Sequence, residues 1–181
     1  MKRCLIVVDY QVDFVVGSLG FEKALSLDNR IAKKIEAYRT SGDDVIFTLD
    51  THGLNYLETY EGRHLPVAHC INGTDGHNLF GMVRKAKKRS DRVFYKNTFG
   101  SDDLYAYLRK TEYSSIEFVG VVTNICVIAN AILAKTAQPE TDIIVDASCV
   151  ASNDEKLNKA ALQVIESLQI QIINKGGEEN G

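Results

Sequence analysis

Apolar residues in this chain gather into six short runs that are rich in Val, Ile and Phe. The runs are Arg3–Asp9, Asp44–Asp50, Arg92–Lys96, Ile116–Val121, Asp142–Asp146 and Ile170–Ile173. Most of them are continuously apolar rather than alternating, which is typical of strands that are buried on both faces. We therefore predict six strands in a mainly parallel sheet.

Helical periodicity fills most of the intervals between these runs. Leu27–Thr40 carries Ile31, Ile35 and Tyr38 on one face and is followed by Ser41-Gly42. The other predicted helices are Ser101–Arg109, Ile125–Thr136 and Asp154–Leu168. Alternating strands and helices predict a three-layer α/β/α fold with right-handed crossovers. We expect one domain over residues 1–175 and a flexible tail over 176–181.

One interval, Thr51–Asn78, breaks this rhythm. It is rich in Gly, His, Asn and Thr and contains both prolines. A long irregular segment in a compact domain is usually either functional or disordered. Its histidines and aromatic residues argue against disorder, so we expect it to contribute to a site.

Length and charge exclude several classes of protein. With 181 residues, 45% of them hydrophobic, the chain fits a soluble globular domain, and its net charge of −3 does not favour nucleic acid or an anionic membrane as partner. The basic run Lys85–Arg89 is better explained as a solvated helix end than as a binding patch. Met1-Lys2-Arg3 precedes only a short apolar run, Leu5–Val8, so we expect neither a signal peptide nor a membrane span, and a cytoplasmic location.

The four cysteines are scattered and include no CxxC pair: they are Cys4, Cys70, Cys126 and Cys149. In a chain expected to be cytoplasmic, free thiols are the default. Each cysteine is therefore core filler, metal ligand or nucleophile, and we favour a core position for Cys70.

Reactive side chains stand at the carboxyl ends of four predicted strands, where open α/β sheets bind their ligands. Asp9, Asp50 and Lys96 each end a strand, and Cys126 follows the fourth where a helix begins. A thiol in a first helical turn feels the positive end of the helix dipole, so we expect a lowered thiol pKa and a nucleophilic role. For proton transfer we favour Asp9 over Asp13, which we expect to hold a loop through backbone hydrogen bonds.

A second group of ligand-type side chains begins at the second strand end. Asp50 and His52 are two residues apart, so they point to one face if the extended conformation persists. Glu61, His64 and His69 follow in the irregular segment. Mixed histidine and carboxylate ligands suit zinc, manganese or iron(II).

Five segments together resemble a known family. They are Val7–Phe14, Phe47–His52, Leu65–Thr74, Phe94–Lys96 and Gly120–Val127. The chain resembles the isochorismatase-like cysteine hydrolases, and within them the nicotinamidases, from about residue 2 to about residue 173. The resemblance implies the isochorismatase-like hydrolase fold.

The resemblance also implies a catalytic apparatus. The family's Asp–Lys–Cys triad falls on Asp9, Lys96 and Cys126. The family's non-proline cis peptide falls on Val121–Val122, and the oxyanion hole would be the backbone N–H groups of Val122 and Cys126. Such donors stabilise the charge that develops on the substrate oxygen.

For the metal, the resemblance implies Asp50, His52 and His69 as ligands. We expect Glu61 as the fourth, with His64 as the alternative. The metal that the resemblance implies is zinc first, with manganese or iron as alternatives, and the pyridine nitrogen of the substrate would ligate it.

The implied reaction is the hydrolysis of nicotinamide to nicotinate and ammonia through a thioester on the cysteine. Phe14 and Val122 would contact the ring, and because the chain has no tryptophan, Tyr56, Leu19 or Phe99 would complete its wall. The alternative is another amidohydrolase of this family that acts on a carbamoyl, ureido or other small amide. Members often form homo-oligomers, and the sequence does not locate the surface that would do so.

Overall fold

The structure, a computed structural model, describes residues 1–175 and contains one six-stranded sheet. The strands lie in the order β3-β2-β1-β4-β5-β6, and neighbouring strands are all parallel within the described residues. Their bounds are β1 Arg3–Val8, β2 Asp44–Asp50, β3 Arg92–Lys96, β4 Ser115–Val121, β5 Asp142–Ala151 and β6 Gln171–Ile173. The predicted fold class is confirmed. The predicted flexible tail, 176–181, lies outside the described residues.

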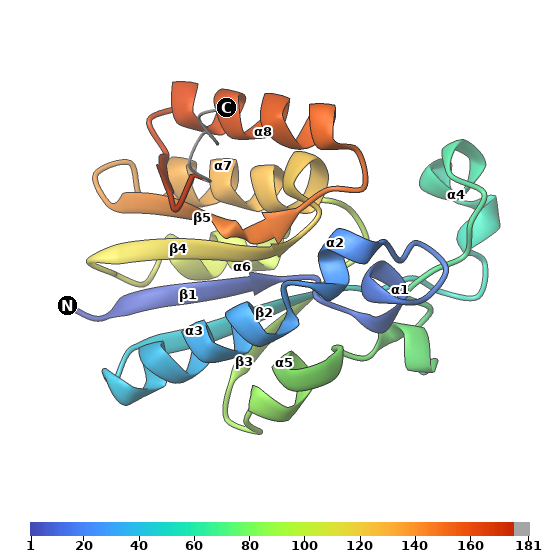
Figure 1. The fold of residues 1–181 in the computed structure, drawn as a ribbon, viewed down its shortest axis with the longest axis horizontal. Coiled ribbons are helices and arrows are strands. Elements are labelled where there is room, and N and C mark those ends of the chain that lie inside the picture. The colour runs from blue at the N-terminus through green and yellow to red at the C-terminus, as the bar shows by residue number, and fades with distance from the viewer. Residues whose placement is uncertain (176–181) are drawn as a thin grey trace, which may run out of the picture.

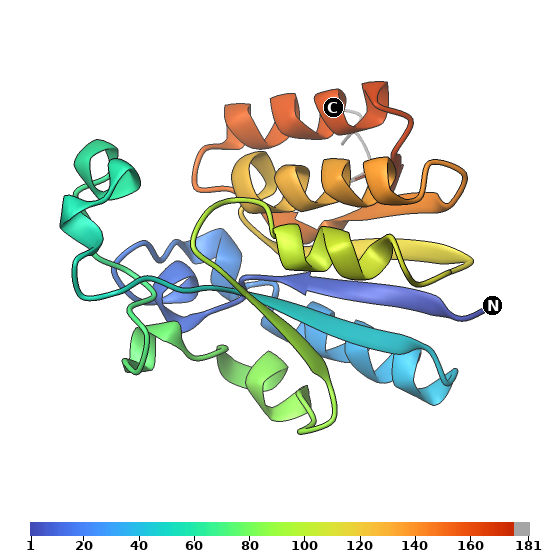
Figure 2. The same cartoon turned by 180° about the vertical axis from the view of Figure 1, so that it is seen from behind.

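Helices cover both faces of the sheet, and short helices lie in the connections at its carboxyl edge (Figures 1 and 2). They are α1 Val12–Val15, α2 Glu22–Leu25, α3 Asp28–Thr40, α4 Tyr60–His64, α5 Gly81–Ala86, α6 Asp102–Leu108, α7 Ile128–Ala137 and α8 Glu155–Ser167. Helices α1, α2, α3 and α5 pack on one face, and α6, α7 and α8 pack on the other.

Alternate residues of the central strand β1 feed two hydrophobic cores. Cys4, Ile6 and Val8 face the core under α6 and α7, whereas Leu5 and Val7 face the core under α3. All five side chains are fully buried. This two-sided burial explains why the strand has a continuous apolar sequence.

Two parts of the fold differ from the predictions. Strand β5 continues past Asp146 to Ala151, because Phe118 pairs with Val145 while Gly120 pairs with Val150, which leaves a bulge in β5. The other difference is a set of one- or two-turn helices in segments predicted to be irregular or left unassigned. Elements this short have too few residues for a readable period.

The segment that contains α4 extends from the carboxyl edge of the sheet as an arm (Figure 1). Short 3-10 turns, Tyr56–Glu58 and Asp75–His77, lie on either side of α4 in the chain. The interval predicted to be irregular thus holds three short helical elements and brings them to the edge where the parallel strands end.

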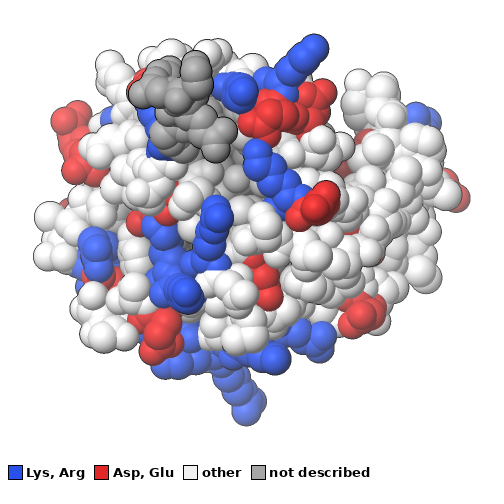
Figure 3. Space-filling view, in the orientation of Figure 1, with Lys and Arg blue, Asp and Glu red and all other residues white. Residues whose placement is uncertain are grey.

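The exterior shows acidic and basic side chains intermixed over the face in Figure 3, with Lys and Arg gathered around α3. Among residues 1–175, no helix is both long and apolar enough to cross a membrane. All four cysteines are buried free thiols, which agrees with the expectation from their spacing.

Candidate active site and metal centre

The reactive strand-end residues meet because four neighbouring strands of the sheet carry them. Lys96 ends β3, Asp50 ends β2, Asp9 follows β1, and Cys126 follows β4 by five residues. Asp9 has a φ of 45°, in the left-handed region that non-glycine residues rarely occupy. Strain of this kind is tolerated where the surroundings fix the backbone, and it clusters at functional sites.

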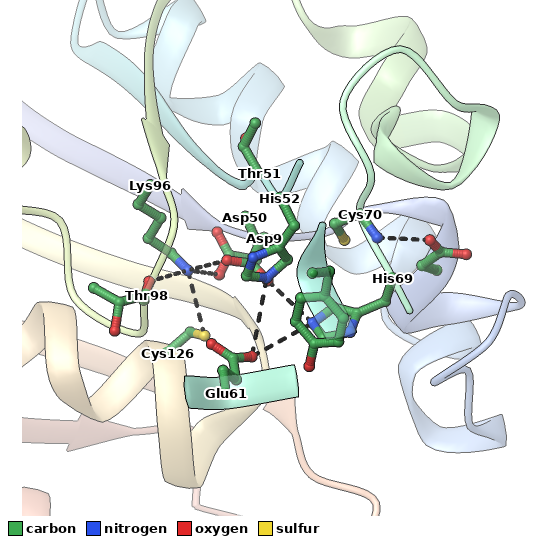
Figure 4. Close-up of polar contacts among 12 residues, drawn as sticks. Asp9, Asp50, Thr51, His52, Glu61, His69, Cys70, Lys96, Thr98 and Cys126 are labelled. Carbon is green, nitrogen blue, oxygen red and sulfur yellow. Dashed lines mark hydrogen bonds and ion pairs between the residues drawn. The ribbon is translucent and has the colours of Figure 1, made fainter. Parts of the chain in front are cut away.

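Lys96 contacts each of the other three strand-end residues, Asp9, Asp50 and Cys126 (Figure 4). Its Nζ lies 2.6 Å from Asp9 Oδ2 and 3.3 Å from Asp50 Oδ1. The same nitrogen lies 3.5 Å from Cys126 Sγ and donates to the Thr98 carbonyl oxygen at 3.0 Å. Burial disfavours the ammonium, but Asp9, Cys126 and Asp50 outweigh it and raise the pKa of Lys96. The lysine therefore stays charged.

Asp9 is fully buried and accepts a hydrogen bond from the Thr48 hydroxyl at 2.7 Å. Burial, the largest cause, raises the pKa of Asp9, and the charge of Asp50 adds to the rise against the opposing effect of Lys96. A carboxylate with a raised pKa is a better proton acceptor than an exposed one.

Cys126 differs from its prediction in one respect. Burial raises the pKa of its thiol well above the ordinary value, with Lys96 opposing the rise and Asp9 and Asp50 adding to it. The prediction of a lowered pKa was wrong, because it counted the helix dipole and ignored the loss of solvent. The raised pKa favours the protonated thiol over the thiolate.

A sharp turn delivers Cys126 to this group. Strand β4 leads into a π-helical turn, Thr123–Val127, that runs into α7 in place of the predicted α-helical start. Gly120 has a φ of 116°, and a Cβ there would lie 2.1 Å from the Val8 carbonyl oxygen, so glycine is required. The peptide bond between Val121 and Val122 is cis, as predicted.

Four ligand-type side chains gather beside the triad. One ligand atom from each of Asp50, His52, Glu61 and His69 lies within 4.8 Å of all the others. Asp50 Oδ2 is 3.0 Å from His52 Nε2 and 3.4 Å from His69 Nε2, and Glu61 Oε1 is 3.9 and 3.7 Å from the same nitrogens.

This donor set fits a divalent metal. The Nδ1 atom of His69 hydrogen bonds with the Val67 carbonyl oxygen at 2.8 Å, which fixes the ring with Nε2 toward the cluster. Burial works against the Asp50 carboxylate, but His52, His69 and Lys96 hold its pKa below the usual range. Two imidazoles and two carboxylates are the ligand types that zinc, manganese and iron(II) accept.

Two expectations about this segment are resolved by its contacts. His64 is exposed, its Nδ1 hydrogen bonds with the Tyr60 carbonyl oxygen, and it stands outside the four-residue cluster, so the geometry favours Glu61. Tyr56 does not line the cavity, so the prediction that it forms part of the cavity wall was wrong. It is 1% exposed, and its ring packs against His52 and His69 at centroid distances of 4.7 and 4.9 Å.

A cavity of about 210 Å³ opens onto both groups. Cys126 and Val122 line it, and so do Asp50, Glu61 and His69 of the neighbouring cluster. The remaining lining is largely apolar: Phe14, Leu19, Phe21, Leu65, Phe99, Ile125 and Asn153. The cavity therefore joins a buried thiol, a cluster of metal-ligand type and a surface suited to a flat ring.

Comparison with known proteins decides the family, because the Isochorismatase domain matches residues 3–175. This chain belongs to the isochorismatase family. An isochorismatase-family protein of Bacillus subtilis is 30% identical over 143 residues, which is 73% of this chain and 78% of that protein.

Solved structures of other proteins superpose on almost the whole chain. Pyrazinamidase/nicotinamidase of Streptococcus mutans is 30% identical with a TM-score of 0.83, and the match covers 95% of this chain and 100% of that one. N-carbamoylsarcosine amidase of Thermoplasma acidophilum is 26% identical with a TM-score of 0.79, covering 95% of both chains.

Some residues around the cavity of this isochorismatase-family chain escaped sequence reasoning. Phe21, Leu65, Ile125 and Asn153 line it without having been predicted. Asn153 follows the true end of β5, so the rule that strand ends carry the chemistry would have found it had that strand been assigned to Ala151. The three apolar residues carry no such signal.

The loop role predicted for Asp13 is confirmed. Its Oδ2 accepts a hydrogen bond from the Cys70 backbone N–H at 2.8 Å, and its Oδ1 accepts from Ser18 at 3.4 Å. Cys70 is fully buried, as expected. Gln11, which was not predicted, exchanges hydrogen bonds with the Asp50 backbone at 2.8 and 2.9 Å.

Proposed function

We propose that this protein is a metal-dependent nicotinamidase, which hydrolyses nicotinamide to nicotinate and ammonia through a thioester on Cys126. The observation that carries the proposal is the shared cavity. Cys126 of the Asp9–Lys96–Cys126 group lines the same small, largely apolar space as Asp50, Glu61 and His69 of the metal-ligand cluster. The isochorismatase family and the similarity to a pyrazinamidase/nicotinamidase support it.

The cavity suits a pyridine carboxamide in size and in lining. Phe14, Leu19 and Phe99 supply apolar and aromatic walls, and Phe14 lies with its ring centroid 5.4 Å from that of His69. Asp50, His52, Glu61 and His69 would hold the divalent metal. When bound, that ion supplies a Lewis-acid site for the ring nitrogen, which would orient the carboxamide toward the thiol.

The first chemical step uses the protonated thiol. The Cys126 sulfur attacks the carboxamide carbon while its proton passes to the Asp9 carboxylate, and the developing oxyanion receives hydrogen bonds from the backbone N–H groups of Val122 and Cys126. The carbon–nitrogen bond then breaks. The leaving nitrogen takes the proton from Asp9 and departs as ammonia.

The second step returns the enzyme to its starting state. Asp9 accepts a proton from water, whose oxygen attacks the thioester carbon, and the carbon–sulfur bond breaks to release nicotinate. The proton on Asp9 returns to the Cys126 sulfur. Lys96 remains charged throughout and stabilises the negative charge as it moves between Asp9 and the sulfur.

The proposal is tested by ammonia release from nicotinamide. The zinc-loaded wild type is expected to release one ammonia for each nicotinate, and Cys126→Ala is expected to release none. Cys149→Ala is the matched control, since it removes a buried thiol outside the cavity. A zinc-loaded wild type that leaves nicotinamide intact would refute the proposal.

A second candidate is hydrolysis of a carbamoyl or ureido compound, favoured by the similarity to N-carbamoylsarcosine amidase. The same nucleophile would serve both reactions. The metal cluster separates them: activity on carbamoyl compounds that survives complete chelation, with no activity on nicotinamide, would establish this second candidate.

A further inference from the structure

Asn130 is a buried asparagine on α7 that the proposed chemistry leaves unused. Its side chain is inaccessible to solvent, yet it makes three hydrogen bonds. The amide nitrogen donates to the Cys126 carbonyl oxygen at 2.8 Å and to the Phe99 carbonyl oxygen at 3.0 Å. The amide oxygen accepts from the Ser101 backbone N–H at 3.0 Å.

These bonds join two segments that are far apart in sequence. One is the turn that holds Cys126, and the other is the loop 97–101, which follows β3 and carries Phe99 into the cavity wall. Lys96 also holds this loop, by donating to the Thr98 carbonyl oxygen. The loop is therefore bonded both to the lysine of the proposed triad and to an amide that contacts the turn of Cys126.

We propose that Asn130 is a positioning residue that fixes Cys126 against Lys96 and Phe99 against the substrate ring. It does so through two separable contacts, one to the turn of Cys126 and one to the loop 97–101. The proposal rests on the proposed function for the role of Cys126. The contacts themselves can be tested without a substrate.

Two variants separate the contacts. Asn130→Ala removes both and is expected to lower kcat by about 10- to 100-fold, the effect of a nucleophile misplaced by about 1 Å. Asn130→Thr retains one, because a threonine hydroxyl can donate to the carbonyl four residues earlier, as Thr136 does to Ile132 in the same helix. Asn130→Thr is expected to have a kcat close to that of the wild type. Its KM is expected to be raised, because residue 130 no longer holds the loop that carries Phe99.

Gln138 provides a matched control at the other end of α7. Its amide nitrogen also donates to two backbone carbonyl oxygens, those of Leu108 and Thr111. Gln138→Ala is expected to lower the thermal midpoint by about as much as Asn130→Ala. It should leave kcat, KM and the reactivity of Cys126 unchanged.

The reactivity of Cys126 is measured as its rate of alkylation by iodoacetamide, followed by mass spectrometry of its peptide. We expect the rate in Asn130→Ala to change at least about fivefold from that of the wild type and the rate in Asn130→Thr to stay close to it. Equal rates in the wild type and Asn130→Ala, or an equal change in Gln138→Ala, would overturn the proposal. If Asn130→Ala does not fold, Asn130→Thr decides: a raised KM supports the positioning role and an unchanged KM refutes it.

Ammonia release and the alkylation of Cys126, measured together, separate this inference from the proposed function. A wild type that releases no ammonia from nicotinamide, while Asn130→Ala still alters the alkylation of Cys126, refutes the substrate and supports the positioning role. If the wild type hydrolyses nicotinamide and Asn130→Ala is unaltered in kcat, KM and alkylation, the substrate is supported and the positioning role is refuted.

Discussion

Two lysines in this protein each lie between two buried carboxylates, and they are used differently. Lys96 contacts Asp9 and Asp50 at the carboxyl edge of the sheet. Lys34, on α3, contacts Glu117 and Asp146 beneath the helix, at 2.5 Å from the latter. Although the charges match, the pKa of Asp9 is raised whereas that of Asp146 is lowered.

The difference lies in the hydrogen-bond donors that surround each carboxylate. Burial raises the pKa of both, but Asp146 accepts from Lys34, from the backbone and hydroxyl of Ser148, and from Asn174. Among the described residues, Asp9 accepts from Thr48 and Lys96 alone, and the nearby charge of Asp50 raises its pKa further. A buried carboxylate with many hydrogen-bond donors stays ionised and supports the fold, whereas one with few donors is able to take up a proton.

The largest expected effect comes from removing the lysine at the edge. Lys96→Met should lower kcat by about 100- to 10,000-fold, because Asp9 then becomes protonated and no longer accepts the thiol proton. Steady-state ammonia release measures it. A loss below tenfold would mean that Lys96 does not control the charge of Asp9.

The same substitution at the other lysine should change stability instead of activity. Lys34→Met leaves Glu117 and Asp146 buried without their cation and should lower the free energy of unfolding by about 3–5 kcal/mol. Urea denaturation measures the loss, and kcat of the folded fraction should equal that of the wild type. If Lys34→Met impairs kcat as strongly as Lys96→Met, the distinction between the two clusters is lost.

The metal cluster at the carboxyl edge of the sheet allows Glu61 and His64 to be distinguished as metal ligands. Glu61→Gln should weaken zinc binding by about 100-fold or more, since even the outer partners of metal ligands contribute 10- to 100-fold. His64→Ala, three residues on and exposed, is the control and should bind zinc as the wild type does. Competition with a chromophoric chelator measures both, and the opposite order would make His64 the ligand.

Acidification should inactivate the enzyme before it disrupts the other cluster. The proposed mechanism needs the Asp9 carboxylate, whose pKa is raised in the free protein, so kcat/KM should fall tenfold per pH unit on a limb that begins above about pH 4, where an ordinary aspartate titrates. The pKa of Asp146 is lowered on folding, so its stabilising effect is complete above about pH 4 and is lost only below that. Parallel pH profiles of kcat/KM and circular dichroism test this order, and coincident losses would contradict it.

The smallest effect concerns a neutral partner in the structural cluster. Tyr38 donates its hydroxyl to Glu117 at 2.6 Å, and Tyr38→Phe should destabilise the protein by about 1–2 kcal/mol. Thermal or urea unfolding measures it. No change in ammonia release is expected, because the two clusters share no residue.

The sequence predicted the centre of the sheet well because strands β2, β1 and β4 are buried on both faces. A strand such as β1 needs apolar residues at every position, and that leaves a pattern that can be read. The continuation of β5 was missed because a bulge with Ser148 and Cys149 interrupts the apolar run. Strand-end reasoning brought out Asp9, Asp50, Lys96 and Cys126, because the edge of a parallel sheet gathers such residues.

The remaining features of the site depend on contacts between segments, which leave no local pattern. Burial of Cys126 reverses the direction of its pKa shift, and burial at one position depends on the packing of the whole chain. Tyr56 and Phe21 are both aromatic residues in loops, yet one lies behind the histidines and the other lines the cavity. Asn130 is an ordinary helix residue until its partners at Cys126 and Phe99 are known.

The order of the strands has a consequence for how such an enzyme diversifies. Four adjacent strands, β3, β2, β1 and β4, bring the proposed triad together, whereas Leu19, Leu65 and Phe99 in the cavity wall come from connecting loops. A change of loop residue therefore alters the shape presented to a substrate while the sheet keeps the reacting atoms in register. Loop grafts from a related amidase that keep Glu61, His69 and the backbone contacts of the loop 97–101 should therefore exchange its substrates at little risk to its fold.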